Sequence, residues 1–305
     1  DWLDVSYHDT LMQAIGYLMT GDTSLQKMLV LLGASRGGKG TVTRVVKDLI
    51  GEKLQGSITL HDFGDSFGLQ GILEKRLVVV PDASDVKLSN RSNALERIKS
   101  ITGNDEISIN RKHKPILGDV RLHTKLLLVA NSHPKFLDES GALANREIPI
   151  EFDRSFFGKE DTRLGEKLRA ELPGIANMAI AALRDLRANG GRFTIGRAGK
   201  AVIRDIERNT SPALRFAGDC LQITGDADDF IPHDAVFERY EAWAGEESLG
   251  GYEFRNRDDF RKDLKAAIGH RGVTYMRRRW RDPNDKSSGR APRVWGWRGL
   301  RINRS

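Results

Sequence analysis

The first 150 residues alternate between short apolar runs and stretches with helical periodicity. Three runs are almost entirely apolar, and each ends in polar or glycine-rich sequence: 28–32, 77–80 and 126–130. Apolar residues then recur at helical spacing within 41–50. Short buried strands that alternate with helices are typical of a parallel sheet covered by helices. The pattern therefore predicts an α/β fold whose functional residues lie where the strands end.

Helical periodicity also dominates the sequence on both sides of this core. It predicts a lead-in helix over 8–20. A second helical region covers 163–188, with a break at Pro173-Gly174, and a further helix covers 197–208.

Beyond residue 210 the pattern changes to helices followed by strands. Three stretches with helical periodicity (212–222, 233–245 and 257–269) precede two strand-like stretches (272–280 and 293–302). The sequence between the two strands is rich in Pro, Gly, Ser and Asp, as loops are. Helices followed by a basic hairpin are the order of elements in a winged-helix module.

Length and composition exclude several classes of protein. The 305 residues correspond to about two domains at roughly 150 residues each. No apolar run approaches the ~20 residues of a membrane span, and 39% hydrophobic residues is typical of a soluble globular chain.

The single cysteine, Cys220, excludes an intrachain disulfide, and we interpret it as a core residue. Without an apolar leader, the sequence predicts a reducing cytoplasm, that of the host cell if the protein is viral. Because the chain begins with Asp1 rather than Met, we expect it to be part of a longer polypeptide.

Positive charge is concentrated at the C-terminus. The last 55 residues contain 16 lysines and arginines and six acidic residues, so they carry +10 whereas the whole chain carries +7. The candidate DNA-binding residues here are Arg277, Arg278, Arg279 and Arg281. Such arginines suit DNA phosphates, while Trp280, Trp295 and Trp297 either stack on bases or pack in a small core. A solvated basic tail is the alternative, although the arginines alternate with apolar residues as strand residues do.

A glycine-rich loop lies between the first apolar run and the helix that follows it. It consists of Gly33, Ala34, Ser35, Arg36, Gly37, Gly38, Lys39, Gly40 and Thr41. Glycines let backbone N–H groups converge on phosphate oxygens, the N-terminus of the next helix adds a positive dipole end, and Lys39 can reach the β- and γ-phosphates. The loop therefore predicts an ATP site with Mg²⁺ as the companion ion.

The residues around this loop depart from the usual pattern in two ways. Gly40 stands where a hydroxyl normally binds Mg²⁺; Thr41 follows it and binds the metal or a phosphate, unless the metal is held through waters. Asp82, at the end of the second apolar run, is the candidate magnesium ligand and can orient the attacking water. A second carboxylate is absent or comes from elsewhere, with Asp85 the nearest candidate. Asn131, at the end of the third run, is suited to position the lytic water or sense the γ-phosphate; Asn131 and Asp82 can alternatively be turn residues.

The order of these motifs resembles the helicase part of phage, plasmid and poxvirus primase-helicases, within helicase superfamily III. The segments that carry the resemblance are Gly33–Thr41, Arg76–Asp82, Ile98–Asp105, Leu126–Asn131, Asn145–Ile150 and Leu168–Ala179. The Thr102-Gly103-Asn104-Asp105 segment is more specific than the loop, which fits many ATPases. The resemblance implies an AAA+-like core, ATP-dependent DNA unwinding, a homo-hexameric ring and, in the intact polypeptide, an N-terminal primase.

Two further assignments combine this resemblance with chemistry. In ring ATPases an arginine of the neighbouring subunit stabilises the γ-phosphate in the transition state, and Arg146 occupies the matching position, with Arg154 in reserve. Two strand-like stretches between 109 and 125 predict a hairpin, whose basic segment is Arg111, Lys112, His113 and Lys114. In related helicases such a hairpin projects into the ring channel and follows the DNA backbone; a solvated basic turn is the alternative.

These features together predict four regions: a helical lead-in (1–25), a P-loop AAA+-like ATPase core (26–155), a helical appendage (156–209) and a basic winged-helix-like DNA-binding domain (210–305). The leading hypothesis is an ATP-driven DNA helicase or translocase module of a phage or plasmid replication protein, acting on single-stranded or forked DNA. A small nucleotide kinase is an alternative because the Gly-Lys-Gly-Thr sequence resembles the loop of adenylate kinases. A nucleotide-switched DNA-binding or origin-recognition module is another, favoured by the single acidic residue Asp82.

Overall fold

The computed structural model describes residues 2–83, 91–134, 143–210, 212–246, 256–281, 285 and 290–303. Within these ranges the chain forms two compact units, of which the first ends at Ile206 and the second begins at Glu207. The boundary falls inside helix α7 (Arg197–Thr210), close to the predicted domain start at 210.

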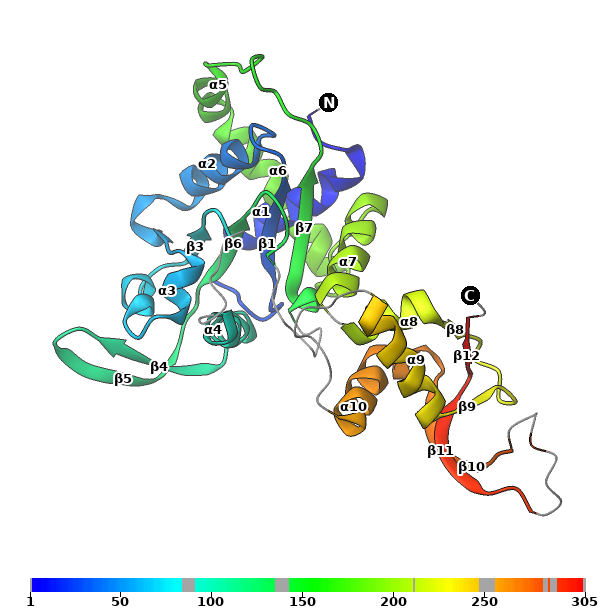
Figure 1. The fold of residues 1–305 in the computed structure, drawn as a ribbon. Coiled ribbons are helices and arrows are strands. Elements are labelled where there is room, and N and C mark those ends of the chain that lie inside the picture. Colours follow the sequence, from blue (N-terminus) through cyan, green and yellow to red (C-terminus); the bar gives the residue numbers. More distant parts are fainter. Residues whose placement is uncertain are drawn as a thin grey trace. The chain divides into compact units, whose positions relative to one another are not determined.

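The first unit is built on a five-stranded parallel sheet (Figure 1). Its strands, in spatial order, are β2 (Gln55–Ser57), β3 (Leu77–Val80), β6 (Lys125–Val129), β1 (Met28–Gly33) and β7 (Glu147–Phe152). The three strands predicted from apolar runs are confirmed as the three inner strands of this sheet. They are buried on both faces, which is why their sequences are continuously apolar.

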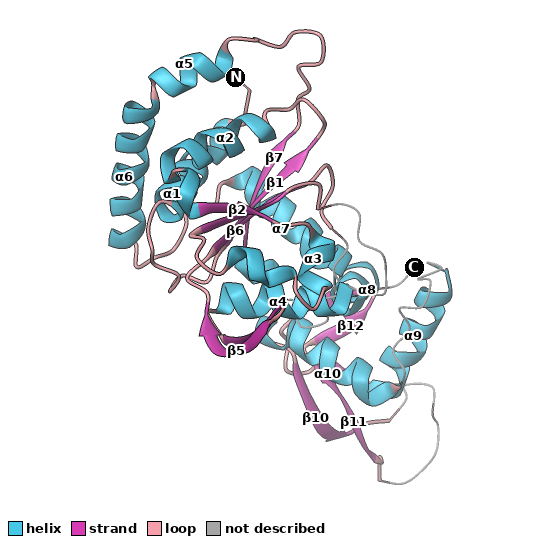
Figure 2. Cartoon of the chain, turned by 90° about the vertical axis from the view of Figure 1, so that its left-hand side faces the viewer, coloured by secondary structure: helices cyan, strands magenta, loops and turns pink. Residues whose placement is uncertain are grey.

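Helices cover both faces of the sheet, as Figure 2 shows. One face packs against α1 (His8–Leu18), α2 (Lys39–Ile50) and α6 (Leu172–Ala188), and the other against α3 (Leu60–Gly64), α4 (Arg91–Gly103) and α7. Alternate residues of β1 belong to different cores, because successive strand side chains point to opposite faces: Val30 packs on the side of α4, and Leu31 on the side of α1.

The segment after β7 is helical, as predicted, but the helices divide at a different residue. α5 (Leu164–Ala170) and α6 meet at Glu171, so the predicted break at Pro173-Gly174 is wrong. Pro173 lies in the first turn of α6. A proline is tolerated there because the N–H groups of a first turn have no partner within the helix.

A two-stranded hairpin projects from the first unit, at the left of Figure 1. Its strands are β4 (Glu106–Arg111) and β5 (Lys114–Arg121), which are antiparallel. Arg111 pairs with Lys114, so the turn consists of Lys112 and His113, and His113 adopts a φ of 58°. The predicted hairpin is therefore present, and it begins a few residues earlier than expected.

The second unit consists of three helices and short antiparallel strands. The helices are α8 (Pro212–Cys220), α9 (His233–Glu246) and α10 (Arg257–Ile268). The strands are β8 (Leu221–Ile223), β9 (Phe230–Pro232), β10 (Thr274–Arg279), β11 (Arg293–Arg298) and β12 (Leu300–Ile302), in sheets of order β10-β11-β9 and β12-β8.

Two predicted boundaries in the second unit are corrected. The helix predicted over 212–222 ends at Cys220, which is buried in the core as expected. The strand predicted over 293–302 is interrupted at Gly299, whose φ of 79° is unfavourable for residues with a side chain. None of the helices that the structure describes is long and apolar enough to cross a membrane.

Candidate functional site

The predicted phosphate loop follows β1 at the carboxyl edge of the sheet and leads into α2. Gly33 and Gly38 have φ values of 121° and 109°, which glycine adopts most readily. A Cβ at Gly33 would lie 2.1 Å from the carbonyl oxygen of Phe152, so β7 leaves no space for a side chain there. Gly38 is the N-cap of α2, and the indole of Trp2 packs against it and against Phe152, with the two rings 5.7 Å apart. The Lys39 and Gly40 N–H groups precede the first backbone hydrogen bonds of α2, which the Thr41 and Val42 N–H groups donate to the Gly38 carbonyl over 3.0 Å.

Lys39 lies within the curve of the loop and is buried. Its ammonium group donates hydrogen bonds to the carbonyl oxygens of Gly33 and Ala34 and, over 3.2 Å, to Oδ1 of Asn131. Burial lowers the pKa of Lys39, and the charge of the nearby Asp82 carboxylate opposes this effect. The structure thus brings together three of the predicted catalytic residues: Lys39 from the first turn of α2, Asp82 from the end of β3 and Asn131 from the end of β6.

Hydrogen bonds between the strand ends explain this convergence. The Ala83 N–H donates to the Val129 carbonyl over 3.0 Å, and the Ala130 N–H donates to the Leu31 carbonyl over 3.0 Å. Asp82 itself is exposed and has a φ of 47°, so its carboxylate is accessible from solvent at this edge. Asp85, the candidate second carboxylate, lies outside the described residues.

Two predicted magnesium ligands, Thr41 and Asp82, lie within the described residues. The Thr41 hydroxyl accepts a hydrogen bond from Arg44 over 3.1 Å, and the Asp82 carboxylate is solvent-exposed. Mg²⁺ is usually held by one or two protein oxygens together with several waters and substrate phosphates. These residues therefore fit a magnesium ion bound mainly through waters and nucleotide phosphates.

Arg44 is a residue of this site that sequence reasoning missed. Its guanidinium nitrogen would lie 3.7 Å from a Cβ at Gly40, so it occupies the side of α2 where a hydroxyl normally stands. Gly40 and Arg44 are four residues apart and therefore neighbours on one face of the helix. That spacing, combined with the missing side chain at Gly40, is the signal that could have identified it.

The segment after β7 holds the tip of the glycine-rich loop. Ser155 Oγ donates to the Ser35 carbonyl over 3.0 Å, and Arg36 forms an ion pair of 2.6 Å with Glu160. Arg154, the reserve candidate for the transition-state arginine, belongs to the same segment and lies beside the loop of its own chain.

Arg146 lies at the opposite edge of the sheet from the loop. It ends the short 3₁₀ helix η5 (Ala144–Arg146), and the next residue, Glu147, pairs with Met28 at the start of β1. The length of β1 separates it from the loop by roughly 17 Å, at about 3.3 Å per residue. Its guanidinium donates to the carbonyl oxygen of Lys99 over 2.5 Å and to the Thr102 hydroxyl over 3.4 Å, at the C-terminal end of α4. It does not reach the glycine-rich loop of its own chain, and a role across a subunit interface stays a prediction.

The hairpin carries its basic residues at the tip. The exposed side chains there are Lys112, His113 and Lys114. Arg111 turns back and donates to the Pro115 carbonyl over 3.1 and 3.0 Å. The Lys112 N–H donates to Gln70 over 2.8 Å, which attaches the tip to η3 (Gly68–Ile72). The backbone of the tip is therefore fixed while its lysine side chains face solvent.

The predicted arginines of the second unit lie on and next to β10. They are Arg277, Arg278, Arg279 and Arg281. Arg278 donates to the Ala227 carbonyl over 3.1 Å, and Arg281 lies 3.9 Å from Asp285. Arg277 is exposed and has no ion pair with any residue in the described part of the chain. Trp297 packs in the core, whereas Trp295 is exposed.

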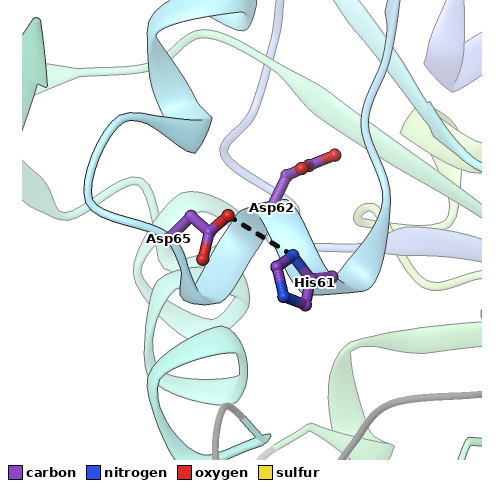
Figure 3. Close-up of side chains that lie close together, drawn as sticks. All are labelled: His61, Asp62 and Asp65. Carbon is purple, nitrogen blue, oxygen red and sulfur yellow. Dashed lines mark ion pairs between the residues drawn. The ribbon is translucent and has the colours of Figure 1, made fainter. Parts of the chain in front are cut away.

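A separate cluster on α3 has the composition of a metal site. His61, Asp62 and Asp65 offer ligand atoms within 4.8 Å of one another, and Figure 3 shows the ion pair of 3.3 Å between His61 and Asp65. Asp62 accepts hydrogen bonds from the N–H and hydroxyl of Thr59, over 2.9 and 2.7 Å, as the second half of a capping box. The capping contact of Asp62 and the position of Asp65 at the C-cap of α3 therefore explain why these side chains lie close together.

Comparisons with known proteins bear on the fold. A model described as a family of unknown function (DUF5906) matches residues 31–146, which contain the loop and the strand ends that Asp82 and Asn131 follow. No match is found among curated proteins. An A-form apo structure of the NrS-1 C-terminal region is similar with a TM-score of 0.50 and 15% identity, over 88% of this chain and 60% of that one. A second apo structure of that region has a TM-score of 0.50 and 14% identity, over 89% of this chain and 64% of that one. The chain spans about three fifths of the length of these structures and shares their fold.

Proposed function

We propose that this chain is the ATP-dependent DNA helicase or translocase module of a phage or plasmid replication protein. The observation that carries the proposal is the meeting of Lys39, Asp82 and Asn131 around a glycine-rich loop at the carboxyl edge of a parallel sheet. The motif order of superfamily III helicases and the shared fold with the NrS-1 C-terminal region support the same assignment.

In this proposal the phosphates of ATP replace the hydrogen bonds that the Lys39 ammonium group makes within the protein. Lys39 exchanges its bonds to Gly33, Ala34 and Asn131 for phosphate oxygens, and the N–H groups at the start of α2 bind the remaining phosphate charge. Asn131, once released from Lys39, orients the attacking water, and Asp82 holds Mg²⁺ directly or through waters. The metal ion supplies charge neutralisation at the β- and γ-phosphates.

The proposal extends to assembly and DNA contacts. We assign the first unit to an AAA+-like core that forms a homo-hexameric ring, with an N-terminal primase in the intact polypeptide. Arg146 is too far from its own loop to stabilise the γ-phosphate there, which supports action on a neighbouring subunit. The exposed lysines of the hairpin suit the DNA backbone, and the arginine-rich strands β10 and β11 suit a winged-helix-like DNA-binding module.

A nucleotide-switched DNA-binding module is the second candidate, and the chemistry at Gly40 favours it. With no hydroxyl at that position and Arg44 beside it, the site has few ligands for the metal that assists hydrolysis. Such a module would bind DNA in an ATP-dependent way with negligible turnover.

The test is phosphate release from ATP, measured with and without single-stranded DNA. We expect DNA to stimulate release, Lys39→Ala to reduce it by about 10²–10³-fold, and the exposed control Lys53→Ala to leave it unchanged. ATP-dependent DNA binding without release would support the switch instead. Phosphorylation of a nucleoside monophosphate that ignores DNA would overturn both in favour of a nucleotide kinase.

A further inference from the structure

One face of the β10–β11 ribbon in the second unit carries aromatic and basic side chains in an ordered row. Side chains alternate between faces along a strand, so Tyr275 and Arg277 share a face with Trp295 and Trp297 across the ribbon. Trp297 is fully buried, whereas Trp295, two residues closer to the N-terminal end of β11, exposes 53% of its surface. The row therefore leads from the core of the unit out to solvent.

The rings of this row form a stack that ends at the exposed indole. Tyr275 and Trp295 lie parallel, with ring centroids 5.3 Å apart and planes at 7°. The guanidinium of Arg261, from α10, lies 5.4 Å from the Tyr275 ring centroid. Trp297 and His233 contact the same tyrosine edge-on, at 4.8 and 5.6 Å. Tyr275 is thus held by several neighbours, and it holds Trp295 in one orientation.

The charged side chains of the two strands that carry this indole are all basic. β10 and β11 contain five arginines and no acidic residue. Arg277 lies directly opposite Trp295, and Arg293 precedes it by two residues on the same face. Among the described residues neither arginine has an ion-pair partner, and both are exposed. A ligand that fits this surface combines a flat apolar ring with closely spaced negative charges.

We propose that Trp295 stacks on an unpaired base of single-stranded DNA while Arg277 and Arg293 bind the flanking phosphates. Stacking requires access to the face of a base, and a base in a duplex presents only its edges in the grooves. An exposed, prealigned indole flanked by arginines therefore fits a single strand better than a duplex. The inference rests on the proposed DNA-linked function, but it concerns binding alone and needs no nucleotide turnover.

The experiment measures binding of the full chain, without nucleotide, to an oligothymidylate and to an abasic deoxyribose-phosphate oligomer of equal length. A base stack contributes about 1–3 kcal/mol, so we expect Trp295→Ala to weaken oligothymidylate binding about 5- to 150-fold. Binding to the abasic oligomer and the salt dependence of binding should stay unchanged, because no charge is removed. Arg277→Ala should instead reduce the slope of log affinity against log salt by about 0.7 on either oligomer.

Two further variants separate stacking from damage to the fold. Trp295→Phe keeps a ring and should retain most of the affinity. Phe67→Ala removes an aromatic ring of similar exposure, 52%, from the first unit and should change nothing. Equal loss on both oligomers, or no loss on either, would overturn the stacking assignment. Wild-type protein that binds oligothymidylate but releases no phosphate from ATP would contradict the proposed ATPase while leaving this site standing.

Discussion

The ammonium group of Lys39 donates a 3.2 Å hydrogen bond to the side-chain oxygen of Asn131, which lies 92 residues further along the chain. This bond links the loop after β1 to the end of the neighbouring strand β6. If the same ammonium group binds the γ-phosphate in the ATP complex, Asn131 and the nucleotide compete for this one partner. The bond therefore offers a direct path by which the state of the phosphate reaches the end of β6.

Substitutions at Asn131 should separate binding from turnover. Asn131→Ala removes an acceptor from Lys39 and should preserve ATP affinity, while turnover falls about 10²-fold or more because the water loses its orienting group. Asn131→Asp should instead weaken ATP binding, because a carboxylate beside Lys39 neutralises it and repels phosphate. Affinity for a non-hydrolysable ATP analogue and phosphate release distinguish the two effects. Equal affinities of the two variants would contradict the shared-partner interpretation.

Gly40→Ser should strengthen the use of Mg²⁺. The position has space, since the nearest atom to a new Cβ would be the Arg44 guanidinium at 3.7 Å. A serine hydroxyl there supplies the metal ligand that the loop lacks, so half-maximal turnover should need less Mg²⁺. Gly40→Ala is the matched control, because any side chain stabilises α2 relative to glycine by up to about 1 kcal/mol. A shift of equal size in both variants would assign the effect to the helix rather than to the hydroxyl.

The sequence predicted the inner part of this structure better than its edges. β1, β3 and β6 are buried on both faces of the sheet, so their sequences are continuous apolar runs. Such runs distinguish these strands from the other elements of the chain and predict them correctly. β2 (Gln55–Ser57) is short, polar and at the sheet edge, and its sequence carries no strand signal. The roles of Arg44 and Trp295 depend on which side chains stand next to them in space, which periodicity does not report. The helix break predicted at Pro173 is wrong because proline, which interrupts the interior of a helix, is also favoured in the first turn.

Arg146 should act on a neighbouring subunit. Arg146→Ala should bind ATP normally and lose about 10³–10⁵ in turnover, the contribution typical of such arginines. Mixing it with Lys39→Ala subunits should restore part of the activity, because mixed rings contain interfaces in which both residues are intact. The measurement is phosphate release from rings that contain both kinds of subunit, as established by a native mass measurement. If Arg146 serves only the end of α4, through Lys99 and Thr102, the variant should lose thermal stability and mixing should restore nothing.

The second unit should lose stability in mild acid through His233. Its Nδ1 accepts a 3.2 Å hydrogen bond from the Trp297 indole, and its Nε2 lies 3.2 Å from the Arg257 carbonyl, which together fit the neutral imidazole. Burial lowers the pKa of His233 below its usual 6.5. The unfolded state therefore binds a proton more readily, so the stabilisation is complete above pH 6.5 and declines as pH falls below it.

Urea unfolding of the second unit, followed by tryptophan fluorescence at about pH 7.5 and about pH 5.5, measures this effect. We expect the free energy of unfolding to fall by at most ~1.4 kcal/mol per pH unit for one proton. His233→Gln should be less stable at neutral pH and lose most of the pH dependence. His61→Gln, at an exposed position, should retain it.

The hairpin lysines should couple ATP turnover to movement along DNA. β4 and β5 lie in the sequence between β3, which Asp82 follows, and β6, which Asn131 follows. The C-terminal end of the hairpin leads directly into β6, and its N-terminal end follows α4. Neutralising Lys112 and Lys114 together should abolish unwinding of forked DNA and DNA-stimulated ATPase. Basal ATPase should be spared, because neither residue contacts the phosphate loop. The control, Lys53→Ala with Lys159→Ala, removes the same charge from exposed positions of the same unit. Wild-type unwinding by the Lys112 and Lys114 variant would leave the hairpin as a solvated turn and the ATPase proposal untouched.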